Sequence, residues 1–103
     1  LLGILGYADG LDALQVAALP RYHHQWMPDA LGIERNALPA GVVTALRAMG
    51  HVVVVPGEDN QGRRSSEAWG NMNTVLWDKR ANTLSGGSDP RSNVGKSRVV
   101  ASP

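Results

Sequence analysis

Two adjacent histidines, His23 and His24, are the residues of this chain whose type most suggests a functional site, because imidazole nitrogen is a common metal ligand. They lie in the stretch LPRYHHQWMPDALGIE, residues 19–34, beside a Trp, a Met and an Arg. Neighbouring side chains point to opposite faces of a strand and diverge by about 100° on a helix, so the pair does not converge on one ion. The chain also lacks two histidines four residues apart, the spacing at which two side chains of one helix reach the same metal ion. His51 would add a third nitrogen only if the fold brought it close. We therefore predict no metal ligand and interpret these histidines as packed or surface residues.

A hydrolytic triad can be written from Ser65 or Ser66, a histidine, and Asp29 or Asp89. No nucleophile-elbow sequence surrounds either serine, and both lie in EDNQGRRSSE, the most polar segment of the chain. The absence of cysteine excludes disulfides, thiolate metal sites and a cysteine nucleophile. From these residues we predict no catalytic residue.

The glycine-containing stretch SGGSDPR, residues 85–91, could offer backbone N–H groups to an anion. No Gly-x-x-x-x-Gly-Lys-Ser/Thr pattern accompanies it, so it predicts a strand end followed by a turn, in which Ser88 or Asp89 hydrogen-bonds nearby backbone ahead of Pro90. We predict no cofactor-binding residue and no cofactor. The tryptophans could stack on a ligand, but such residues more often supply apolar bulk to a core or an interface, and we assign them to that role: Trp26, Trp69 and Trp77.

Composition limits the classes of protein to which the chain can belong. Its 103 residues suffice for at most one domain, and a net charge of +1 argues against a nucleic-acid partner. No apolar run approaches the ~20 residues that span a bilayer. The opening LLGILGYADG is apolar on every side of its expected helix, which is typical of a helix buried in a larger body. We therefore expect the chain to begin inside a helix of something longer, and the isolated chain to self-associate.

Hydrophobic spacing and the residues that cap helices predict the order of the elements. Asp12 is an expected N-cap, and Gly50 an expected C-cap glycine. Expected helices cover residues 1–9, 13–18 and 39–49, and expected strands cover residues 30–35, 52–55, 72–77 and 83–85, the last two joined by the turn DKRAN. This order predicts the α+β class, with a mixed sheet of about four strands and accompanying helices in residues 1–91. Residues 92–103 are expected to form a poorly ordered tail.

Four motifs in the same order resemble the small subunit of the γ-glutamyltranspeptidase family. ALPRYHHQWMPDALGIE resembles that family's Pro-Arg-x-His-His-Gln-Trp/Leu-x-Pro-Asp-x-Leu, and LPAGVVTALRAMGHVV resembles a helix that precedes Lys/Arg-Gly-His and a strand. WGNMNTVLWD resembles a Met-Gly-x-x-Gln strand, and LSGGSDPR resembles the closing Tyr-Gly-Ala-Ser-Asp-Pro-Arg. The resemblance covers residues 1–91, from which we identify the C-terminal part of a small subunit.

The resemblance implies a fragment of the αββα fold of N-terminal-nucleophile (Ntn) hydrolases. It implies a parent that cleaves itself and uses the new N-terminal Thr, with its α-amine as base, to transfer or hydrolyse γ-glutamyl groups of glutathione-like substrates. A Gly-Gly pair would supply oxyanion-hole N–H groups. None of these residues maps onto this chain, so its site residues are expected to be none, whether catalytic, cofactor-binding or metal-binding.

The implied role of the chain is structural, and its implied partner is the remainder of the parent: the large subunit and the N-terminal part of the small subunit. If the parent is a typical bacterial member, its implied location is periplasmic or secreted. Whether the parent is a transpeptidase, a hydrolase or an acylase stays open. The alternative is a non-catalytic α+β interaction module, or a fragment of a related acylase or hydrolase.

Overall fold

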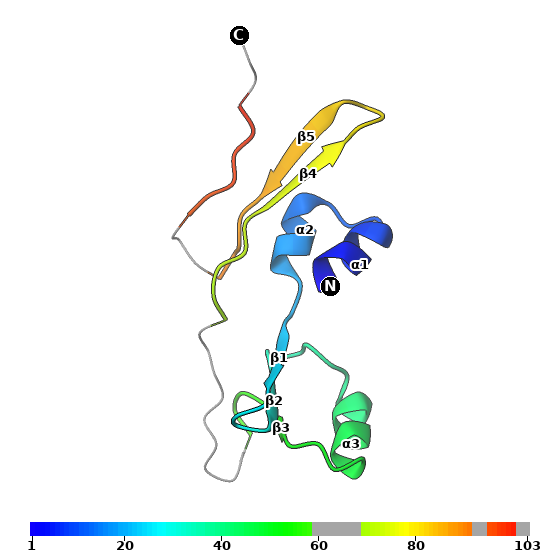
Figure 1. Ribbon diagram of the computed structural model, residues 1–103, viewed down its shortest axis with the longest axis vertical. Coiled ribbons are helices and arrows are strands. Elements are labelled where there is room, and N and C mark those ends of the chain that lie inside the picture. Colours follow the sequence, from blue (N-terminus) through cyan, green and yellow to red (C-terminus); the bar gives the residue numbers. More distant parts are fainter. Residues whose placement is uncertain (59–68, 92–94, 101–103) are drawn as a thin grey trace. The chain divides into compact units, whose positions relative to one another are not determined.

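The computed structural model describes residues 1–58, 69–91 and 95–100, which belong to two compact units (Figure 1). The first, called here the helix–hairpin unit, consists of two segments that are far apart in sequence, Leu1–Leu19 and Gly70–Pro103. The three-stranded unit is the continuous middle of the chain, Pro20–Trp69. The predicted boundary between residues 91 and 92 is not tested by this division and stays a prediction, and residues 92–94 and 101–103 of the expected tail lie outside the described residues.

Two short helices begin the helix–hairpin unit, α1 (Leu2–Ala8) and α2 (Ala13–Ala18). The predicted N-cap of α2 is confirmed: the Asp12 carboxylate accepts a hydrogen bond from the Gln15 N–H at 2.8 Å. The Gln15 side chain accepts in return from the Asp12 N–H at 2.9 Å. This reciprocal pair satisfies two N–H groups that a helix start otherwise leaves without partners. It defines the first turn of α2.

Replacement of Asp12 by alanine is expected to lower the free energy of unfolding by about 1 kcal/mol, the usual cost of losing an N-cap. The change removes the acceptor for the Gln15 N–H without disturbing a buried group, since Asp12 is exposed. Urea denaturation of the chain followed by circular dichroism measures the difference. Asp9→Ala is the matched control, because Asp9 is exposed and lies at the C-terminal end of α1, where no N-cap is lost. A loss in the control as large as in Asp12→Ala would contradict the capping role.

Helix α1 approaches its neighbours through glycines. A Cβ on Gly3 would lie 3.2 Å from Val16, and one on Gly6 would lie 2.9 Å from Leu19. Glycines therefore form much of the inward side of α1, beside the partly buried Leu2, while most large apolar residues of the helix and its N-cap are exposed: Leu1, Ile4, Leu5 and Tyr7. This is the reverse of an ordinary surface helix, which turns its apolar side inward.

A β-hairpin completes this unit. β4 (Thr74–Asp78) pairs antiparallel with β5 (Thr83–Gly87), with Trp77 opposite Leu84. In the turn, the Asp78 carboxylate accepts from the N–H groups of Arg80 and Ala81, and Asn82 has the positive φ of 51° that closes it. The hairpin that the sequence predicts around DKRAN is therefore present.

Both β4 and β5 pack on α2. Gly87, at the end of β5, lies so close to the first turn of α2 that a Cβ there would overlap the carbonyl of Ala13. The hairpin and the helix meet through backbone at this point, and only glycine fits.

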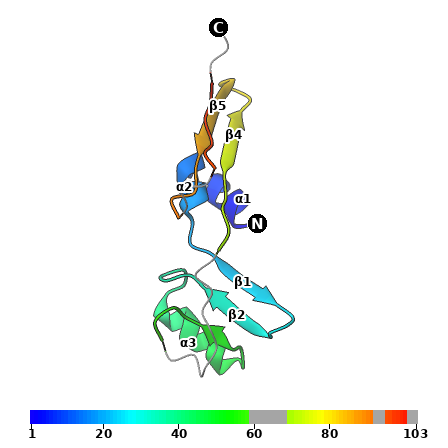
Figure 2. The ribbon, with the colours of Figure 1, turned by 90° about the vertical axis from the view of Figure 1, so that its left-hand side faces the viewer.

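The three-stranded unit contains a small mixed sheet, and its strands β1 (Tyr22–Gln25) and β2 (Ala30–Ile33) form an antiparallel pair (Figure 2). The third strand, β3 (Val53–Val54), runs parallel to β2, and α3 (Ala40–Ala48) is the connection between them. The α3 helix ends as expected, since Gly50 has a φ of 94°, a conformation that glycine adopts at little cost.

The core of this unit lies between α3 and the sheet. Ile33, Val43 and Val53 are buried and form one cluster, against which partly buried residues pack: Leu31, Ala37, Leu38, Leu46 and Val55. The Arg47 side chain, on α3, donates to the Val53 carbonyl at 3.1 Å and to the Glu58 carboxylate at 2.9 Å. The helix is thereby fixed to the strand that follows it.

The observed fold confirms the predicted α+β class. The described strands form a three-stranded mixed sheet and a two-stranded antiparallel sheet, where the sequence led us to expect about four strands in one sheet. Strand β1 had no counterpart among the expected strands, because Tyr-His-His-Gln lacks the apolar alternation of a half-buried strand. Pairing with β2 makes it a strand. No helix in the described part of the chain is long and apolar enough to cross a membrane.

Candidate functional site

The most buried polar group among the described residues is the carboxylate of Asp89, whose side chain is 0 % exposed. It lies two residues after the end of β5 and accepts hydrogen bonds from two segments. One oxygen accepts from the Met72 N–H, ahead of β4, at 2.9 Å. The other accepts from the Arg91 N–H at 2.9 Å. A buried carboxylate is stable only when its oxygens are occupied in this way, so Asp89 joins the two outer ends of the hairpin.

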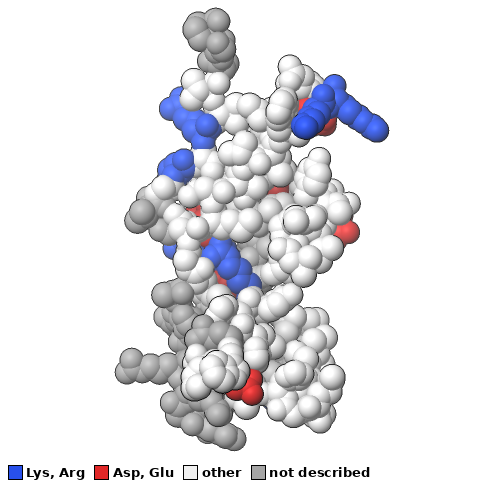
Figure 3. All heavy atoms as spheres, in the orientation of Figure 1, with Lys and Arg blue, Asp and Glu red and all other residues white. Residues whose placement is uncertain are grey.

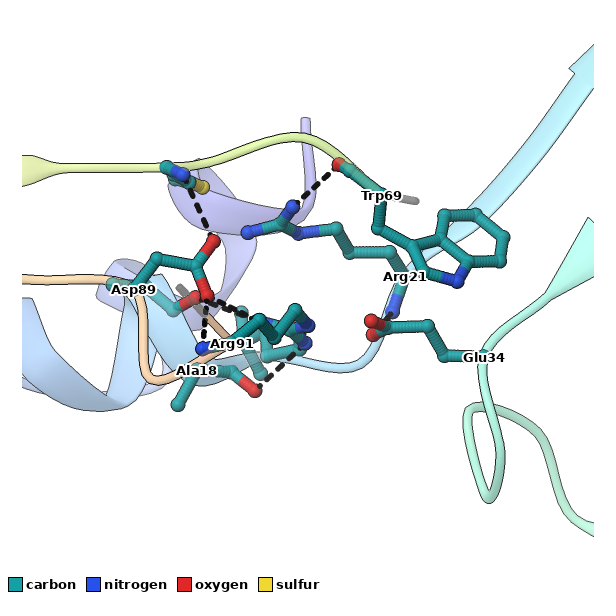
Figure 4. A network of polar contacts seen from close by, with 9 residues as sticks. Ala18, Arg21, Glu34, Trp69, Asp89 and Arg91 are labelled. Carbon is teal, nitrogen blue, oxygen red and sulfur yellow. Dashed lines mark hydrogen bonds and ion pairs between the residues drawn. The ribbon is translucent and has the colours of Figure 1, made fainter. Parts of the chain in front are cut away.

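Arg91 extends this network to the C-terminal end of α2. Its guanidinium lies 3.1 Å from Asp89 and donates to three successive carbonyls, those of Ala17 at 3.2 Å, Ala18 at 3.3 Å and Leu19 at 2.8 Å (Figure 4). The last carbonyls of a helix have no partners within it, and the helix dipole favours a cation there. Helix α2 has no basic residue in its own last turn. Arg91 therefore supplies the cap from the far end of the chain.

A second network lies in the three-stranded unit, around Arg21. The Arg21 guanidinium donates to the Trp69 carbonyl at 2.7 Å, and the Arg21 backbone N–H donates to the Glu34 carboxylate at 2.8 Å (Figure 4). The Glu34 N–H donates back to the Arg21 carbonyl at 2.8 Å. These bonds join the start of β1 to the residue after β2 and to Trp69. They are contacts that hold segments together.

The histidines of the HHQW stretch lie on β1 and are exposed. His24 Nε2 is 3.0 Å from a carboxylate oxygen of Asp29, so these two side chains bridge the β1–β2 turn. His51 is exposed after α3, where its N–H donates to the Leu46 carbonyl. Within the described residues, no group of three or more His, Cys, Asp or Glu side chains is placed to hold a metal ion. The prediction of no metal ligand stays a prediction.

The structure does not assemble the triad that can be written from the sequence. Ser65 and Ser66 lie outside the described residues. Asp29 is 84 % exposed and pairs with His24, whereas Asp89 is committed to Met72 and Arg91. Neither aspartate is arranged as the partner of a histidine base beside a described serine. The expectation of no catalytic residue stays untested.

The turn after β5 has the local bonds expected from its sequence. Ser88 accepts a hydrogen bond from the Ser97 N–H at 2.8 Å, and Asp89 accepts from the Arg91 N–H across Pro90. The sequence predicts that Asp89 bonds nearby backbone. It does not predict that Asp89 is buried or that Arg91 caps α2, because both depend on contacts between segments distant in sequence, those of Arg91 being more than 70 residues away. The signal that could have suggested them is the sequence Gly-Gly-Ser-Asp-Pro-Arg, in which an acidic and a basic residue stand on the two sides of a proline.

The tryptophans are not in the core. Trp26 is 83 % exposed and Trp77 is 58 % exposed, while Trp69 is partly buried against Gly32. A core role does not fit Trp26 and Trp77, whereas Trp69 is partly buried, and the assignment to an interface stays a prediction. On the face drawn in Figure 3, the described Lys and Arg side chains stand in separate groups on a largely uncharged surface.

The comparisons with known proteins agree on one family. The model of the family described as gamma-glutamyltranspeptidase matches residues 4–99. The glutathione hydrolase proenzyme of Escherichia coli (strain K12) is 32 % identical over 83 residues, which are 81 % of this chain and 12 % of that protein.

Two solved structures resemble the fold. A threonine-to-alanine mutant of Helicobacter pylori γ-glutamyltranspeptidase superposes with a TM-score of 0.63 at 29 % identity, over 88 % of this chain and 45 % of that one. An acivicin-inhibited γ-glutamyltranspeptidase gives a TM-score of 0.64 at 28 % identity, over 89 % of this chain and 45 % of that one. The chain spans less than half the length of each of these relatives.

Proposed function

This chain belongs to the γ-glutamyltranspeptidase family, and from that premise we propose that it forms the C-terminal, structural part of the small subunit of a γ-glutamyltranspeptidase-like enzyme. The observation that carries the proposal is the family match over residues 4–99, which contains all four motifs in order. The parent enzyme would transfer or hydrolyse γ-glutamyl groups of glutathione-like substrates. The name of the curated relative, a glutathione hydrolase proenzyme, supports that substrate class.

The nucleophile of the parent would lie outside this chain. An Ntn hydrolase attacks with the hydroxyl of a threonine whose own α-amine is free to act as base. The described residues include all three threonines of the chain: Thr44, Thr74 and Thr83. The Thr44 hydroxyl donates to the Ala40 carbonyl within α3, and the other two belong to the hairpin. This arrangement supports a chain without a catalytic residue of its own.

A structural contribution is compatible with an effect on chemistry. In the acivicin-inhibited γ-glutamyltranspeptidase, the C-terminus has critical roles in autoprocessing and catalysis. In this chain the segment after β5 offers a physical route to such an effect. Asp89 and Arg91 hold the ends of the hairpin and the last turn of α2 in one arrangement, so their loss would move elements on which the rest of the enzyme packs.

The 103-residue chain alone is expected to release no chromophore from a γ-glutamyl anilide, because it contains neither the processed threonine nor the oxyanion glycines. Absorbance of the released aniline measures turnover. The complete protein that contains these residues, assayed under the same conditions, is the positive control. Turnover by the chain alone at a rate comparable to that of the complete protein would contradict the structural assignment.

The complete coding sequence tests the proposal independently. It is expected to encode several hundred residues upstream, with a threonine at a processing site and a Gly-Gly pair. A coding sequence without them would exclude the enzyme and favour the non-catalytic interaction module. A complete protein that cleaves other acyl anilides but not γ-glutamyl anilide would indicate an acylase of this family.

A further inference from the structure

The three-stranded unit interrupts the sequence of the helix–hairpin unit. Leu19 precedes it and Gly70 follows it, and both of these residues belong to the helix–hairpin unit. The three-stranded unit therefore begins at Pro20 and ends at Trp69. Contacts between these two ends decide whether the unit is closed by its own residues.

Arg21 joins the two ends of the unit. Its guanidinium donates to the Trp69 carbonyl, 48 residues away in sequence, at 2.7 Å (Figure 4). Its backbone is bonded to Glu34 in both directions: its N–H donates to the Glu34 carboxylate, and its carbonyl accepts from the Glu34 N–H. Hydrogen bonds with a charged donor are among the stronger ones. Arg21 is thus fixed to the sheet by its backbone and holds the last residue of the unit by its side chain.

The Trp69 side chain lies on the face of the sheet that α3 does not cover. Ile33 packs in the cluster that contains Val43 of α3, and successive residues of a strand point to opposite faces. Gly32 and its partner Val54 therefore belong to the other face, called here the second face. A Cβ on Gly32 would lie 3.6 Å from Cη2 of Trp69, and Val54 is only 5 % exposed. The second face is covered here by a residue of the same unit.

We propose that Pro20–Trp69 is a self-closing module, in which Trp69, held by Arg21, covers the second face of the sheet. The module then opens and closes independently of the helix–hairpin unit. Three strands packed on a helix are about the minimum for independent stability, and an aromatic side chain adds about 150–250 Å² of buried surface. The inference goes beyond the proposed function, because it holds whether the parent is a transpeptidase, a hydrolase or an acylase.

The alternative is that both units open together, in one cooperative step. Proteins open locally in contiguous cooperative units, each with its own free energy of opening. If the module is such a unit, a weakened contact within it raises amide exchange in the module alone. If the two units open only together, the same change raises amide exchange in both.

Amide hydrogen exchange of the complete protein, read by mass spectrometry of its peptides, distinguishes these cases. Arg21→Met keeps a long unbranched side chain but removes the donor to Trp69. Peptides containing β2 and β3 are expected to exchange at least about tenfold faster, the effect of losing one hydrogen bond from a charged donor. Peptides containing β4 and β5 are expected to be unchanged. Arg35→Met is the matched control, because Arg35 is exposed in the same unit and lies against Gly57; it should change neither set of peptides.

Asp89→Ala gives the reciprocal test, since Asp89 belongs to the helix–hairpin unit. Exchange in β4 and β5 is expected to rise, while exchange in β2 and β3 stays the same. Equal acceleration in both units, in either variant, would overturn the independence of the module, and unfolding of the whole protein by Arg21→Met counts as this result. Unchanged exchange of β2 and β3 in Arg21→Met would overturn the role of Arg21. Turnover of γ-glutamyl anilide by the unaltered protein reads the proposed function separately, so the two can fail independently.

Discussion

Replacement of Asp89 by alanine is expected to lower the free energy of unfolding by about 3 kcal/mol, the lower end of the cost of breaking a buried ion pair by removing one partner. The change removes the acceptor of the Met72 and Arg91 backbone N–H groups and the ion-pair partner of the Arg91 guanidinium, at a site where the lost side chain is 0 % exposed. The lower end is appropriate because the Arg91 side chain is 23 % exposed and recovers some hydration. Urea denaturation, with the midpoint and the slope fitted together, measures the loss.

Asp78→Ala is the matched control for this prediction. Asp78 also accepts two backbone N–H bonds, from Arg80 and Ala81, but it lies in the exposed turn of the hairpin. Its removal should cost about 1 kcal/mol, the net value of hydrogen bonds that water can replace. Asp89→Asn, which keeps one acceptor oxygen and adds a donor, should fall between the two. Equal losses for Asp89→Ala and Asp78→Ala would show that burial of Asp89 contributes nothing.

Replacement of Gly87 by alanine is expected to lower the free energy of unfolding by a similar amount, about 3 kcal/mol, at the upper end of the cost of overpacking. The added Cβ would overlap the carbonyl carbon and oxygen of Ala13 and the nitrogen of Leu14. Backbone atoms cannot turn aside as a flexible side chain can, so the hairpin and α2 must separate. The thermal unfolding midpoint and the urea midpoint of the variant measure this separation.

Gly86→Ala is the matched control, since the neighbouring residue of the same strand points to the opposite face. Its new Cβ would lie 3.3 Å from the Ser97 side chain, in a segment near the end of the chain. That segment can shift by a few tenths of an ångström, so the expected change is within about 1 kcal/mol. A loss as large in Gly86→Ala as in Gly87→Ala would refute the close backbone contact with α2.

Local features of the fold could be predicted where local chemistry decides them. The Asp12 cap of α2, the glycine that ends α3 and the hairpin turn at Asp78 all depend on residues within a few positions. Strand β1 could not be predicted from its own sequence, because partners on β2 decide it. The division into two sheets was not predictable either, since alternation indicates a strand without indicating which strand it pairs with.

The candidate site also depends on contacts between distant segments, which the sequence does not predict. The sequence directs attention to exposed residues: His23 and His24 on β1, and Trp26 and Trp77. The buried charge is Asp89, which the sequence presents as an ordinary turn residue before a proline. Its burial depends on Met72 and Arg91, and the role of Arg91 depends on α2. Spacing along the chain carries no information about these contacts, whereas the family motif marks the segment without explaining it.

The cap that Arg91 places on α2 sets an order of events during synthesis. The three carbonyls that it binds lie 72–74 residues upstream. At the ribosomal rate of about 5–20 residues per second, α2 is exposed for about 4–14 s before its cap is made. The three-stranded unit is continuous in sequence and can fold during that interval. The helix–hairpin unit contains two segments distant in sequence, so it cannot form completely until the second segment has been translated. A ribosome that stops before Arg91 therefore releases a chain in which the last carbonyls of α2 lack their cap.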